Sequence, residues 1–541
     1  MNTESRATLF DWAVFAALAA MALAPALVLG DSDFTYSDAS RHAMDGVFVL
    51  DAIRELLIAH PLEWAKKYYA TSPALGMGRY PPLLAVVEVP FYAALGVRPI
   101  AGRLACGLLW LAGLVFFYET ARGVMGRGAG AFAAAALGAG PLSVRWACDV
   151  MLELPATAFL LAAAYFYMRY LGEGGRGKLT WALVLIALGG WTKQPAAILI
   201  AAVVAHFGLV RRRLGRPLED MVPGIILAAA FLVPLAALSA VFGRANLSLV
   251  GGAGRAFPLA SSANWIYYVK GIGHSYLGWP LTVVMGAGVL MSLAGRGPRG
   301  AGFFGLWAAV FYLFFSALGY KSARLNMFWT PGLAFFAGAG LWRILEGAPA
   351  WRKFAAGAAG VLAVVATYDE GFFELPRPGA PLYETAAKGL AFSPKRIFYV
   401  GEENGTFVFR VRQLAGRERP TVVRDSKVLY VDVIQRELGR AEKAWTVGDL
   451  REAMARISPD VVVVERLAAP GEPRPRAVGL FLEYVQGSDF EEVSTVTARR
   501  HGSKRATQFF DIYLYQGRRN PGTFDIPMPG VGTELTIPHG R

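Results

Sequence analysis

The sequence predicts a polytopic α-helical membrane protein of about 11 transmembrane helices with a C-terminal extracytoplasmic α/β domain. Hydrophobic residues make up 55% of the 541 positions and charged residues only 17%, against roughly 25% charged in soluble domains. Several apolar runs reach the roughly 18–20 residues that a helix needs to cross a bilayer. After about residue 370 these runs give way to short β-type segments.

The first apolar run, residues 10–29, lies close to the start of the chain. Its length and the lack of a small-x-small cleavage pattern favour an uncleaved span over a secretory signal. Further spans are predicted at 100–121, 154–170, 222–242, 277–294, 302–319, 328–346 and 352–367, and a tight two-span hairpin at 180–210.

One short apolar segment leaves the number of spans open. Residues 81–97 begin with two prolines and contain Glu88 and Pro90. Either this segment lies in the membrane interface, or it crosses the membrane and a neighbour such as residues 128–140 does not. The alternation of inner and outer loops does not decide between the two.

The net charge of +14 is explained by membrane topology rather than by nucleic-acid binding. Cytoplasmic loops retain Lys and Arg, so the basic loops mark the cytoplasmic side and place the N-terminus there. We therefore expect a multi-pass protein of the plasma (inner) membrane, in contact with membrane lipid and without a nucleic-acid partner. The basic loops lie at 122–127, 169–178, 211–216, 296–299 and 343–353.

This orientation divides the chain into two predicted domains. Residues 1–370 form a multi-span domain with a large first outer loop at 31–80, and residues 371–541 form a soluble extracytoplasmic, or periplasmic, α/β domain. The second domain has no phosphate loop or catalytic-triad pattern, so we expect it to act as a cap or as a platform for an acceptor. Its predicted strands lie at 397–401, 407–411, 428–433, 461–465 and 512–515, and a helix is predicted at 446–457.

Acidic and basic residues gather in the first predicted outer loop. Charged groups near a bilayer are costly, which makes them functional hypotheses by default. A helix is predicted from Ala39 onward, with Ser37 or Asp38 near its N-cap. For any one of the acids, a solvated helix at the interface is the alternative interpretation. The charged residues of this loop include Asp38, Asp45, Asp51, Arg41 and His42.

The second outer loop reads RWACDVMLELP and carries two further acids. Asp149 and Glu153 are four residues apart, which predicts that both lie on one face of a helix. Like charges at this spacing repel each other. A purely structural role, such as a helix-end ion pair, would therefore need compensation, and Arg145 is the candidate.

Three cations lie in other predicted outer loops: Lys193 at the tip of the 180–210 hairpin, and Lys321 and Arg324 at the outer end of later spans. Snorkelling towards lipid headgroups is the alternative for each of them. Together with the acids they suit one chemistry. A carboxylate takes the proton of an acceptor hydroxyl as general base, and cations stabilise a phosphate as it leaves. The two cysteines have no metal-ligand spacing, and we expect neither a metal nor a cofactor.

Six short motifs, in the same order along the chain, resemble those of the membrane-embedded glycosyltransferases of the GT-C superfamily. The likeness is to its protein O-mannosyltransferase and aminoarabinose-transferase (PMT/ArnT-like) branch, and it covers about residues 10–345. The motifs are SDASRHAMDG after the first span, RYPPL from Arg79, GVRPIAGR from Gly96, RWACDVMLELPATAF from Arg145, LGGWTKQP from Leu188 and YKSARLNMFWTP from Tyr320.

The resemblance implies a GT-C-type fold and a glycosyltransferase. The reaction would move a hexosyl or pentosyl group from a polyprenyl-phosphate carrier to a hydroxyl-bearing lipid, protein or glycan, with inversion. It implies Asp38 as the general base, with Asp45 in reserve because Ala39 follows Asp38 where the family has an acid pair. Glu153 matches the second-loop acid and would orient the acceptor or the base. The remaining implied residues are Asp149 as a further catalytic acid, Lys193, Lys321 and Arg324 at the donor phosphate, and Arg41, His42, Arg79 and Tyr80 as substrate contacts.

Three rival functions remain, one of which is a non-catalytic receptor with an outer sensor domain. A transporter or flippase of a lipid-linked sugar would place its charges near the membrane midplane, often on repeat-related helices, whereas these lie at one face and no repeat is visible. An oligosaccharyltransferase-like or ligase-like enzyme would use the same kind of donor. The sequence leaves the sugar, the acceptor and the oligomeric state open.

Overall fold

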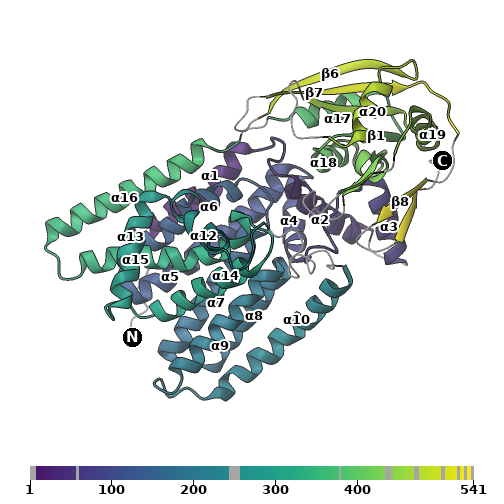
Figure 1. Cartoon of the computed structure of the whole chain (residues 1–541). Helices are drawn as coiled ribbons and strands as arrows, with labels where there is room; N and C mark the ends of the chain where they lie inside the picture. Colours follow the sequence, from purple (N-terminus) through teal and green to yellow (C-terminus); the bar gives the residue numbers. More distant parts are fainter. Residues whose placement is uncertain are drawn as a thin grey trace.

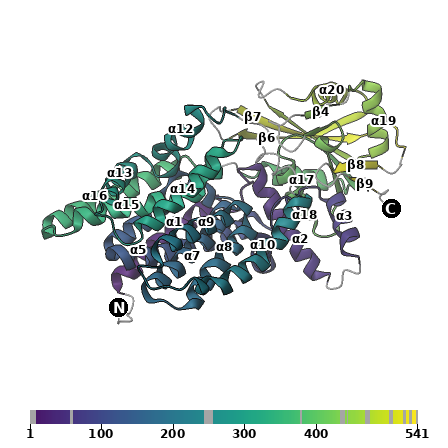
Figure 2. The same cartoon turned by 60° about the horizontal axis from the view of Figure 1, so that its bottom comes forward.

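The chain folds into a helical bundle followed by an α/β unit at one end of it. In two views related by rotation, this unit lies at the end of the bundle opposite the N-terminus (Figures 1 and 2). The structure is a computed structural model, and it describes residues 8–55, 60–242, 256–376, 379–432, 440–442, 444–467, 474–500, 506–520, 524–528 and 533–537.

The bundle consists of α-helices joined by short loops and single 3-10 or π turns. Its α-helices are α1 (Leu9–Leu29), α2 (Ser37–Arg54), α3 (Pro61–Thr71), α4 (Leu83–Leu95), α5 (Pro99–Ala139), α6 (Pro141–Ala147), α7 (Glu153–Glu173), α8 (Arg176–Thr192), α9 (Leu199–Val210), α10 (Val222–Phe242), α12 (Ser262–Lys270), α13 (Trp279–Leu293), α14 (Ala301–Ala317), α15 (Thr330–Leu345) and α16 (Ala350–Phe373). The shorter turns are η1 (Gln194–Ile198), η2 (Leu218–Met221), η3 (Ile272–Tyr276) and η4 (Ala323–Trp329).

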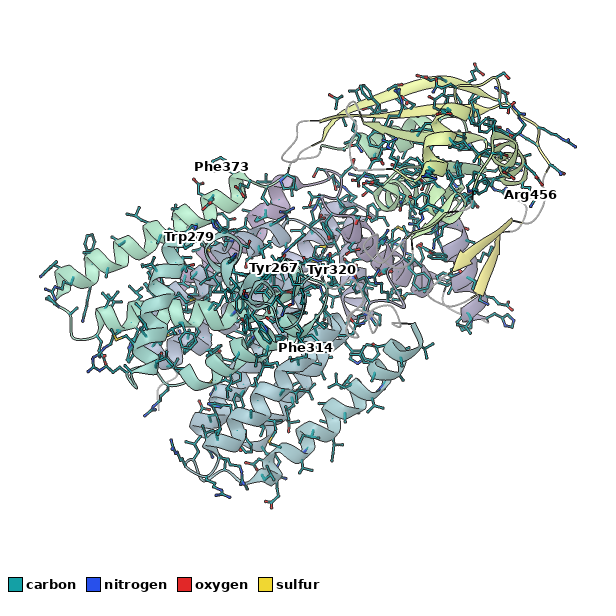
Figure 3. All side chains as sticks on the ribbon, viewed as in Figure 1. Tyr267, Trp279, Phe314, Tyr320, Phe373 and Arg456 are labelled. Atoms are coloured by element: carbon teal, nitrogen blue, oxygen red, sulfur yellow. The ribbon has the colours of Figure 1, made fainter. Side chains whose placement is uncertain are left out.

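Within the described residues, 3 helices are long and apolar enough to cross a membrane: Leu9–Leu29, Pro99–Ala139 and Leu218–Val241. Shorter apolar helices accompany them, so the full number of crossings stays a prediction. Exposed aromatic side chains occur on the bundle, and Phe373 at the end of α16, labelled in Figure 3, is 72% exposed.

Helices α4 and α5 help to decide whether residues 81–97 or residues 128–140 cross the membrane. α5 is broken at Gly126, whose φ of 79° is non-helical, so residues 128–140 follow the preceding span after a kink. α4 has 13 residues and is therefore about 20 Å long, shorter than the roughly 30 Å hydrocarbon core of a bilayer. This length favours the interfacial placement of residues 81–97.

Small residues let the central helices pack closely. A Cβ atom at Gly113 of α5 would lie 2.7 Å from the Cα of Ala158 on α7, and one at Gly338 of α15 would lie 2.7 Å from the Cβ of Ala133 on α5. Backbones approach this closely only where side chains are absent or small. The close packing of α5 against α7 and α15 gives the loops at the helix ends a rigid base.

The C-terminal unit is built on a mixed five-stranded sheet in the order β2-β1-β5-β7-β6. β1 pairs in parallel with β2 and β5, and β7 is antiparallel to β5 and β6. Its elements are α17 (Pro381–Leu390), β1 (Arg396–Val400), α18 (Asn404–Ala415), β2 (Thr421–Arg424), η5 (Asp425–Lys427), β3 (Tyr430–Asp432), β4 (Arg440–Glu442), α19 (Val447–Ile457), β5 (Val461–Leu467), α20 (Arg476–Tyr484), β6 (Phe490–Arg500), β7 (Ala506–Tyr515), β8 (Phe524–Met528) and β9 (Thr533–Ile537).

One predicted strand is wrong. Residues 407–411 lie in helix α18, where Phe407 stacks on Tyr399 of β1 and Phe409 packs on Phe34 of the first loop. Because α18 is buried on two sides, its apolar run has no helical periodicity and reads as a strand. The strands predicted at 397–401, 461–465 and 512–515 and the helix at 446–457 are confirmed, and that at 428–433 is confirmed as β3, residue 433 lying outside the described residues.

Buried ion pairs join the C-terminal unit to the segment around α2. Asp33 accepts a hydrogen bond of 2.7 Å from Nε of Arg410 and another of 2.8 Å from the backbone N–H of Leu382. Asp51 accepts from Nε and Nη2 of Arg412 at 3.0 and 2.6 Å. These pairs hold α2 between the bundle and α18.

Candidate active site

Asp38 lies in the first turn of α2, where the N-terminal end of a helix favours a carboxylate. Its Oδ2 accepts a hydrogen bond of 3.0 Å from Nη1 of Arg324, and its Oδ1 lies 3.4 Å from Nη1 of Arg41. Burial opposes ionisation of Asp38, but Arg324 and Arg41 outweigh it and hold the pKa of the carboxyl below its ordinary value. Asp38 is therefore an ionised carboxylate.

Arg324 links Asp38 to a second buried pair. Its Nε lies 3.3 Å from Oε1 of Glu153, and the same oxygen accepts a hydrogen bond from Nζ of Lys193. The four side chains form a row of alternating charge, Asp38, Arg324, Glu153 and Lys193, called the central cluster below. They come from α2, η4, the start of α7 and the residue between α8 and η1.

Glu153 and Lys193 of the central cluster are buried, Asp38 and Arg324 are mostly buried, and the hydrogen bonding of the cluster is incomplete. The exposed fractions of the Asp38, Arg324, Glu153 and Lys193 side chains are 15%, 13%, 1% and 8%. Among the described residues, Oε2 of Glu153 and Nε of Arg324 have no hydrogen-bond partner. Buried polar atoms are nearly always paired in native proteins, so unpaired atoms in a row of charges mark where a polar ligand can bind.

Aromatic rings border the central cluster. The guanidinium of Arg324 lies 4.8 Å from the ring centre of Tyr36, and Tyr36 meets Trp146 edge to face at 5.3 Å. Tyr80 packs against His42 at 4.8 Å. Burial and the nearby Asp38 raise the pKa of Tyr80 to about 12, so its hydroxyl keeps its proton and can donate it in a hydrogen bond.

Asp149 does not share a helical face with Glu153, contrary to the sequence prediction. α7 begins only at Glu153, and Asp149 lies in the loop before it. Arg145 does not compensate Asp149: the guanidinium of Arg145 lies over the ring of Trp146, and Nη2 of Arg103 is 3.8 Å from Oδ1 of Asp149. Because Asp149 lies outside the helix, it is not subject to the repulsion from Glu153 that an i, i+4 spacing within one helix would cause.

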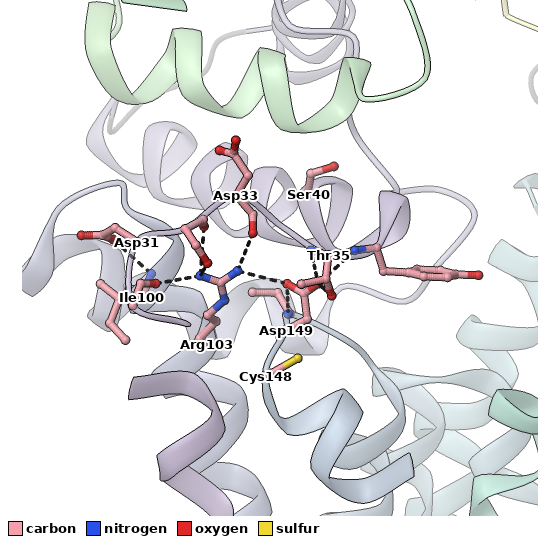
Figure 4. A network of polar contacts seen from close by, with 12 residues as sticks. Asp31, Asp33, Thr35, Ser40, Ile100, Arg103, Cys148 and Asp149 are labelled. Carbon is pink, nitrogen blue, oxygen red and sulfur yellow. Dashed lines mark hydrogen bonds and ion pairs between the residues drawn. The ribbon is translucent and has the colours of Figure 1, made fainter. Parts of the chain in front are cut away.

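Asp149 and Arg103 instead fix the segment that leads into α2 (Figure 4). Oδ2 of Asp149 accepts from the backbone N–H and the hydroxyl of Thr35, both at 2.8 Å. Arg103 donates to the carbonyls of Gly30, Ser32 and Asp33 at 2.7 to 3.0 Å. Together they set the position of the first turn of α2, and so of Asp38.

Asp45 holds a different loop. Its Oδ1 accepts from the backbone N–H groups of Gly76 and Met77, both at 2.9 Å, and Nδ1 of His42 lies 4.0 Å from its Oδ2. Burial raises the pKa of Asp45 above its ordinary value in spite of His42 and these hydrogen bonds. Asp45 thus positions the turn that precedes Arg79.

The loop that carries Arg79 and Tyr80 is hydrogen-bonded to the residue next to Lys193, which places both residues beside the central cluster. The side-chain amide of Gln194, next to Lys193, donates 3.1 Å to the carbonyl of Arg79, and the Arg79 guanidinium lies 5.6 Å from the Tyr80 ring centre. Lys321 is placed differently. Its Nζ donates to the carbonyls of residues 315, 316 and 318 at 2.7 to 3.0 Å, at the C-terminal end of α14.

Some residues of the site were not predicted. Tyr36, Trp146 and Gln194 each adjoin a predicted charged residue but carry no charge themselves, so the charge pattern did not select them. Arg103 belongs to the GVRPIAGR motif, but no role was predicted for it from the sequence alone. An arginine inside an apolar run is nevertheless itself a signal of a buried polar partner. Among the described residues, no group of three His, Cys, Asp or Glu side chains is arranged to hold a metal ion.

Residues 80–239 match the sequence family described as dolichyl-phosphate-mannose-protein mannosyltransferase. This match agrees with the order of the motifs along the chain and with the fold. The match, the motif order and the fold together support assignment to the PMT/ArnT-like branch of the GT-C superfamily. They likewise support a membrane glycosyltransferase. Glu153 and Lys193 lie within the matched region, whereas Asp38 and Arg324 lie on either side of it. No curated protein sequence matches the chain.

Solved structures share this PMT/ArnT-like fold at low sequence identity. ArnT from Cupriavidus metallidurans bound to undecaprenyl phosphate has a TM-score of 0.61 and 15% identity, over 93% of this chain and 98% of that one. Arabinofuranosyltransferase AftD from Mycobacteria has a TM-score of 0.53 and 17% identity, over 96% of this chain but 41% of that one. The Archaeoglobus fulgidus oligosaccharyltransferase has a TM-score of 0.51 and 11% identity, over 84% of this chain and 68% of that one.

Proposed function

We propose that the protein transfers a sugar from a polyprenyl-phosphate carrier to a hydroxyl group of an acceptor, with Asp38 as general base. The observation that carries this proposal is Arg324, which pairs on one side with a carboxylate, Asp38, and on the other with the Glu153–Lys193 pair. A base for an acceptor and cations for a phosphate thus lie within one buried cluster. The undecaprenyl phosphate bound to the similar ArnT structure supports a carrier of this class.

The leaving phosphate would bind between Lys193 and Arg324. Guanidinium and ammonium groups are the usual protein ligands of phosphate, and a buried site strengthens their effect on the charge that develops on the leaving group. In the structure, Oε1 of Glu153 pairs with both cations. The donor phosphate would take over part of this pairing, and the unpaired Nε of Arg324 offers it a hydrogen bond.

Binding of the donor would also prepare the base. Arg324 holds the pKa of Asp38 low, and a carboxylate so stabilised is a weak base. When Arg324 turns towards the phosphate, Asp38 loses part of this stabilisation and its pKa rises towards its ordinary value. Asp38 then becomes a stronger base only when the donor is in place.

The reaction itself would be one displacement. The acceptor O–H gives its proton to a carboxylate oxygen of Asp38 while the acceptor oxygen forms a bond to the anomeric carbon of the sugar. The bond from that carbon to the phosphate oxygen breaks at the same time, and polyprenyl phosphate leaves with the electron pair. Attack opposite the leaving group inverts the configuration. Glu153 keeps Lys193 and Arg324 in place between turnovers.

The site is proposed to face the outer side of the plasma membrane, with the N-terminus in the cytoplasm. Asp11, near the start of α1, lies 3.1 Å from Arg122 and 3.3 Å from Arg127, so the first basic loop is at the same end of the bundle as the N-terminus. The C-terminal unit and α2 are at the other end (Figures 1 and 2). Basic loops are retained in the cytoplasm, which supports this orientation.

Release of free polyprenyl phosphate from a polyprenyl-phosphate sugar by the purified protein tests the proposal. We expect release that depends on a hydroxyl acceptor, and its loss in Asp38→Asn and Glu153→Gln variants that melt like the wild type. Pentose and hexose donors, with lipid, peptide and glycan acceptors, would define the sugar and the acceptor. Transbilayer movement of the intact sugar-lipid without any release would instead identify a flippase.

A further inference from the structure

A second group of cations lies where α2 and α3 meet the C-terminal sheet. Arg41 of α2, Arg424 at the end of β2 and Lys427 of η5 lie close enough to the hydroxyl of Tyr69 on α3 to act on it electrostatically. These four residues are called the junction cluster below.

Helix packing brings the junction cluster together. A Cβ atom at Gly405 of α18 would lie 2.3 Å from Oγ of Ser40, so α18 and α2 are in direct contact beside Arg41. Asn404, the neighbour of Gly405, accepts a hydrogen bond of 2.7 Å from Nη1 of Arg424. α18, α2 and α3 lie side by side in both views of the molecule (Figures 1 and 2).

The acids beside this cluster, among the described residues, do not balance its positive charge. Within the part of the chain that the structure describes, neither Arg424 nor Lys427 forms an ion pair. Arg424 is only 6% exposed, and its Nε has no hydrogen-bond partner. Arg41 is paired only with Asp38, which Arg324 also neutralises. Burying unpaired cations costs free energy, which a bound anion would recover.

The acid nearest in sequence does not supply this anion. Asp425 accepts hydrogen bonds from the backbone N–H groups of Gly401 at 3.1 Å and Ser426 at 2.6 Å. Burial raises its pKa to about 8, so the carboxyl is mostly neutral at pH 7. Burial also lowers the pKa of Lys427. Burial raises the pKa of the partly buried Tyr69, but Lys427, Arg424 and Arg41 outweigh it and lower this pKa, as expected where cations lie close together.

We propose that the junction cluster is a binding site for a phosphate-type anion, separate from the donor phosphate site at Lys193 and Arg324. Two guanidinium groups and one ammonium match the several oxygens and the charge of a phosphate, whereas a carboxylate would satisfy only part of them. The side chain of Arg41 is 33% exposed and leaves the cluster open on one side. The anion is either a lipid headgroup or a free phosphate.

An anion bound at the junction cluster would affect the central cluster through Arg41, which belongs to the junction cluster and is paired with Asp38 of the central cluster. Arg41 lies 3.4 Å from Asp38, so a phosphate that attracts Arg41 weakens its hold on the candidate base. The binding site itself does not depend on the proposed reaction. It is a property of Arg41, Tyr69, Arg424 and Lys427, and its test needs no turnover.

The test measures the melting temperature of the full-length protein in neutral detergent against inorganic phosphate, with chloride replaced at constant ionic strength. It uses the Lys193→Gln background, which weakens the donor phosphate site. We expect phosphate to raise Tm in this background, because a ligand that binds only the folded state stabilises it. Adding Lys427→Gln should weaken the apparent phosphate affinity about tenfold or more, as expected on removing one charge-assisted hydrogen bond. Lys388→Gln, an exposed lysine of α17 paired with Glu384, is the matched control and should leave the affinity unchanged.

Two further arms complete the experiment. Arg41→Gln provides a second, partly exposed position if Lys427→Gln lowers the yield of folded protein, and it should weaken phosphate binding as well. Nanodiscs with phosphatidylglycerol in place of phosphatidylcholine distinguish the sources. Loss of the phosphate effect in these nanodiscs identifies a lipid headgroup, and its persistence identifies a free phosphate. The proposal is overturned if phosphate has no effect in the Lys193→Gln background, or if Lys427→Gln and Arg41→Gln both leave it intact.

Discussion

Two acids of the same helix, Asp38 and Asp51, both pair with arginines far away in the sequence, but in different ways. Asp51 is fully engaged: both of its oxygens bind Arg412, and Oδ2 also accepts 2.8 Å from the hydroxyl of Tyr68. Asp38 meets Arg324 and Arg41 through one hydrogen bond each. The Asp51–Arg412 pair, in which both carboxylate oxygens are bound, can only stabilise the fold. Asp38 shares Arg324 with Glu153, so this pair can exchange partners.

The same difference separates the two regions as wholes. The pair of Asp51 joins α2 to α18, and that of Asp33 joins the segment before α2 to α18. Both oxygens of each acid have partners, so neither acid offers a ligand an unpaired oxygen. In the central cluster, one oxygen of Glu153 serves both Lys193 and Arg324, and its other oxygen is unpartnered. Incomplete pairing in a buried site costs stability, and it is tolerated where a ligand completes it.

The largest expected effect comes from the shared acid. Asp38→Asn should lower acceptor-dependent release of polyprenyl phosphate by about 10²–10⁴-fold, the usual contribution of a general base. Its melting temperature should change little, because Arg41 and Arg324 keep other partners or reach solvent. Steady-state turnover and differential scanning fluorimetry on one preparation check both parts. If Asp45→Asn abolishes release while Asp38→Asn does not, the base is Asp45.

The saturated acid should behave in the opposite way. Asp51→Asn leaves Arg412 buried without its charge partner, and breaking such a pair costs about 3–5 kcal/mol of stability. We expect a lower denaturation midpoint and, per folded molecule, near-normal turnover. The double variant Asp51→Leu, Arg412→Met should regain part of the stability, since it leaves no unpaired charge. A single variant as stable as the wild type would contradict the structural role of this pair.

Lys193 and Lys321, both predicted to bind the donor phosphate, should differ in the same way: one should affect donor binding and the other stability. Lys193→Gln is expected to lower kcat/KM for the donor about 10–100-fold through the lost charge-assisted hydrogen bond. Lys321→Gln is expected to cost about 1–3 kcal/mol of stability, because Lys321 binds carbonyls at the end of α14. Donor kinetics and chemical denaturation of both variants check this. Equal kinetic defects would place Lys321 at the donor after all.

The smallest effect concerns pH and the C-terminal unit. Asp425 has a pKa of about 8 in the folded protein against 3.8 ordinarily, so the folded state binds its proton more tightly than the unfolded state. Its ionisation therefore costs stability as the pH rises from about 4 to about 8. Asp425→Asn removes this cost, and its Tm relative to the wild type should rise between pH 5 and pH 6 by the equivalent of about 1 kcal/mol. The same relative Tm at both pH values would count against a raised pKa. Glu452→Gln, an exposed acid of α19, is the control.

Much of this organisation could be predicted from the sequence, because hydropathy and charge are local. The helix at α2, the hairpin around Lys193 and the later strands follow from periodicity and turn residues. Grouping of Asp38, Glu153, Lys193 and Arg324 was also predicted, since all four lie at predicted loop ends. Their pairing was not predictable, because Asp38 and Arg324 are 286 residues apart.

The failures have physical reasons. α18 was mistaken for a strand because burial on two sides removes helical periodicity. Asp149 was placed on a helix by spacing alone, and nothing local showed that Arg103 and Thr35 would hold it in a loop. The junction cluster joins α2 and α3 to β2 and η5, and such contacts between distant segments exist only in the folded chain.

The proposed mechanism requires that Arg324 is shared between the base and the donor phosphate. The direct measurement is the affinity of the purified protein for polyprenyl phosphate, compared between the wild type and Asp38→Asn, with Asp45→Asn as a control that has no ion pair to Arg324. Removing the charge of Asp38 frees Arg324, so we predict binding about tenfold tighter in Asp38→Asn, together with the loss of turnover. Unchanged or weaker binding in Asp38→Asn would contradict the shared arginine.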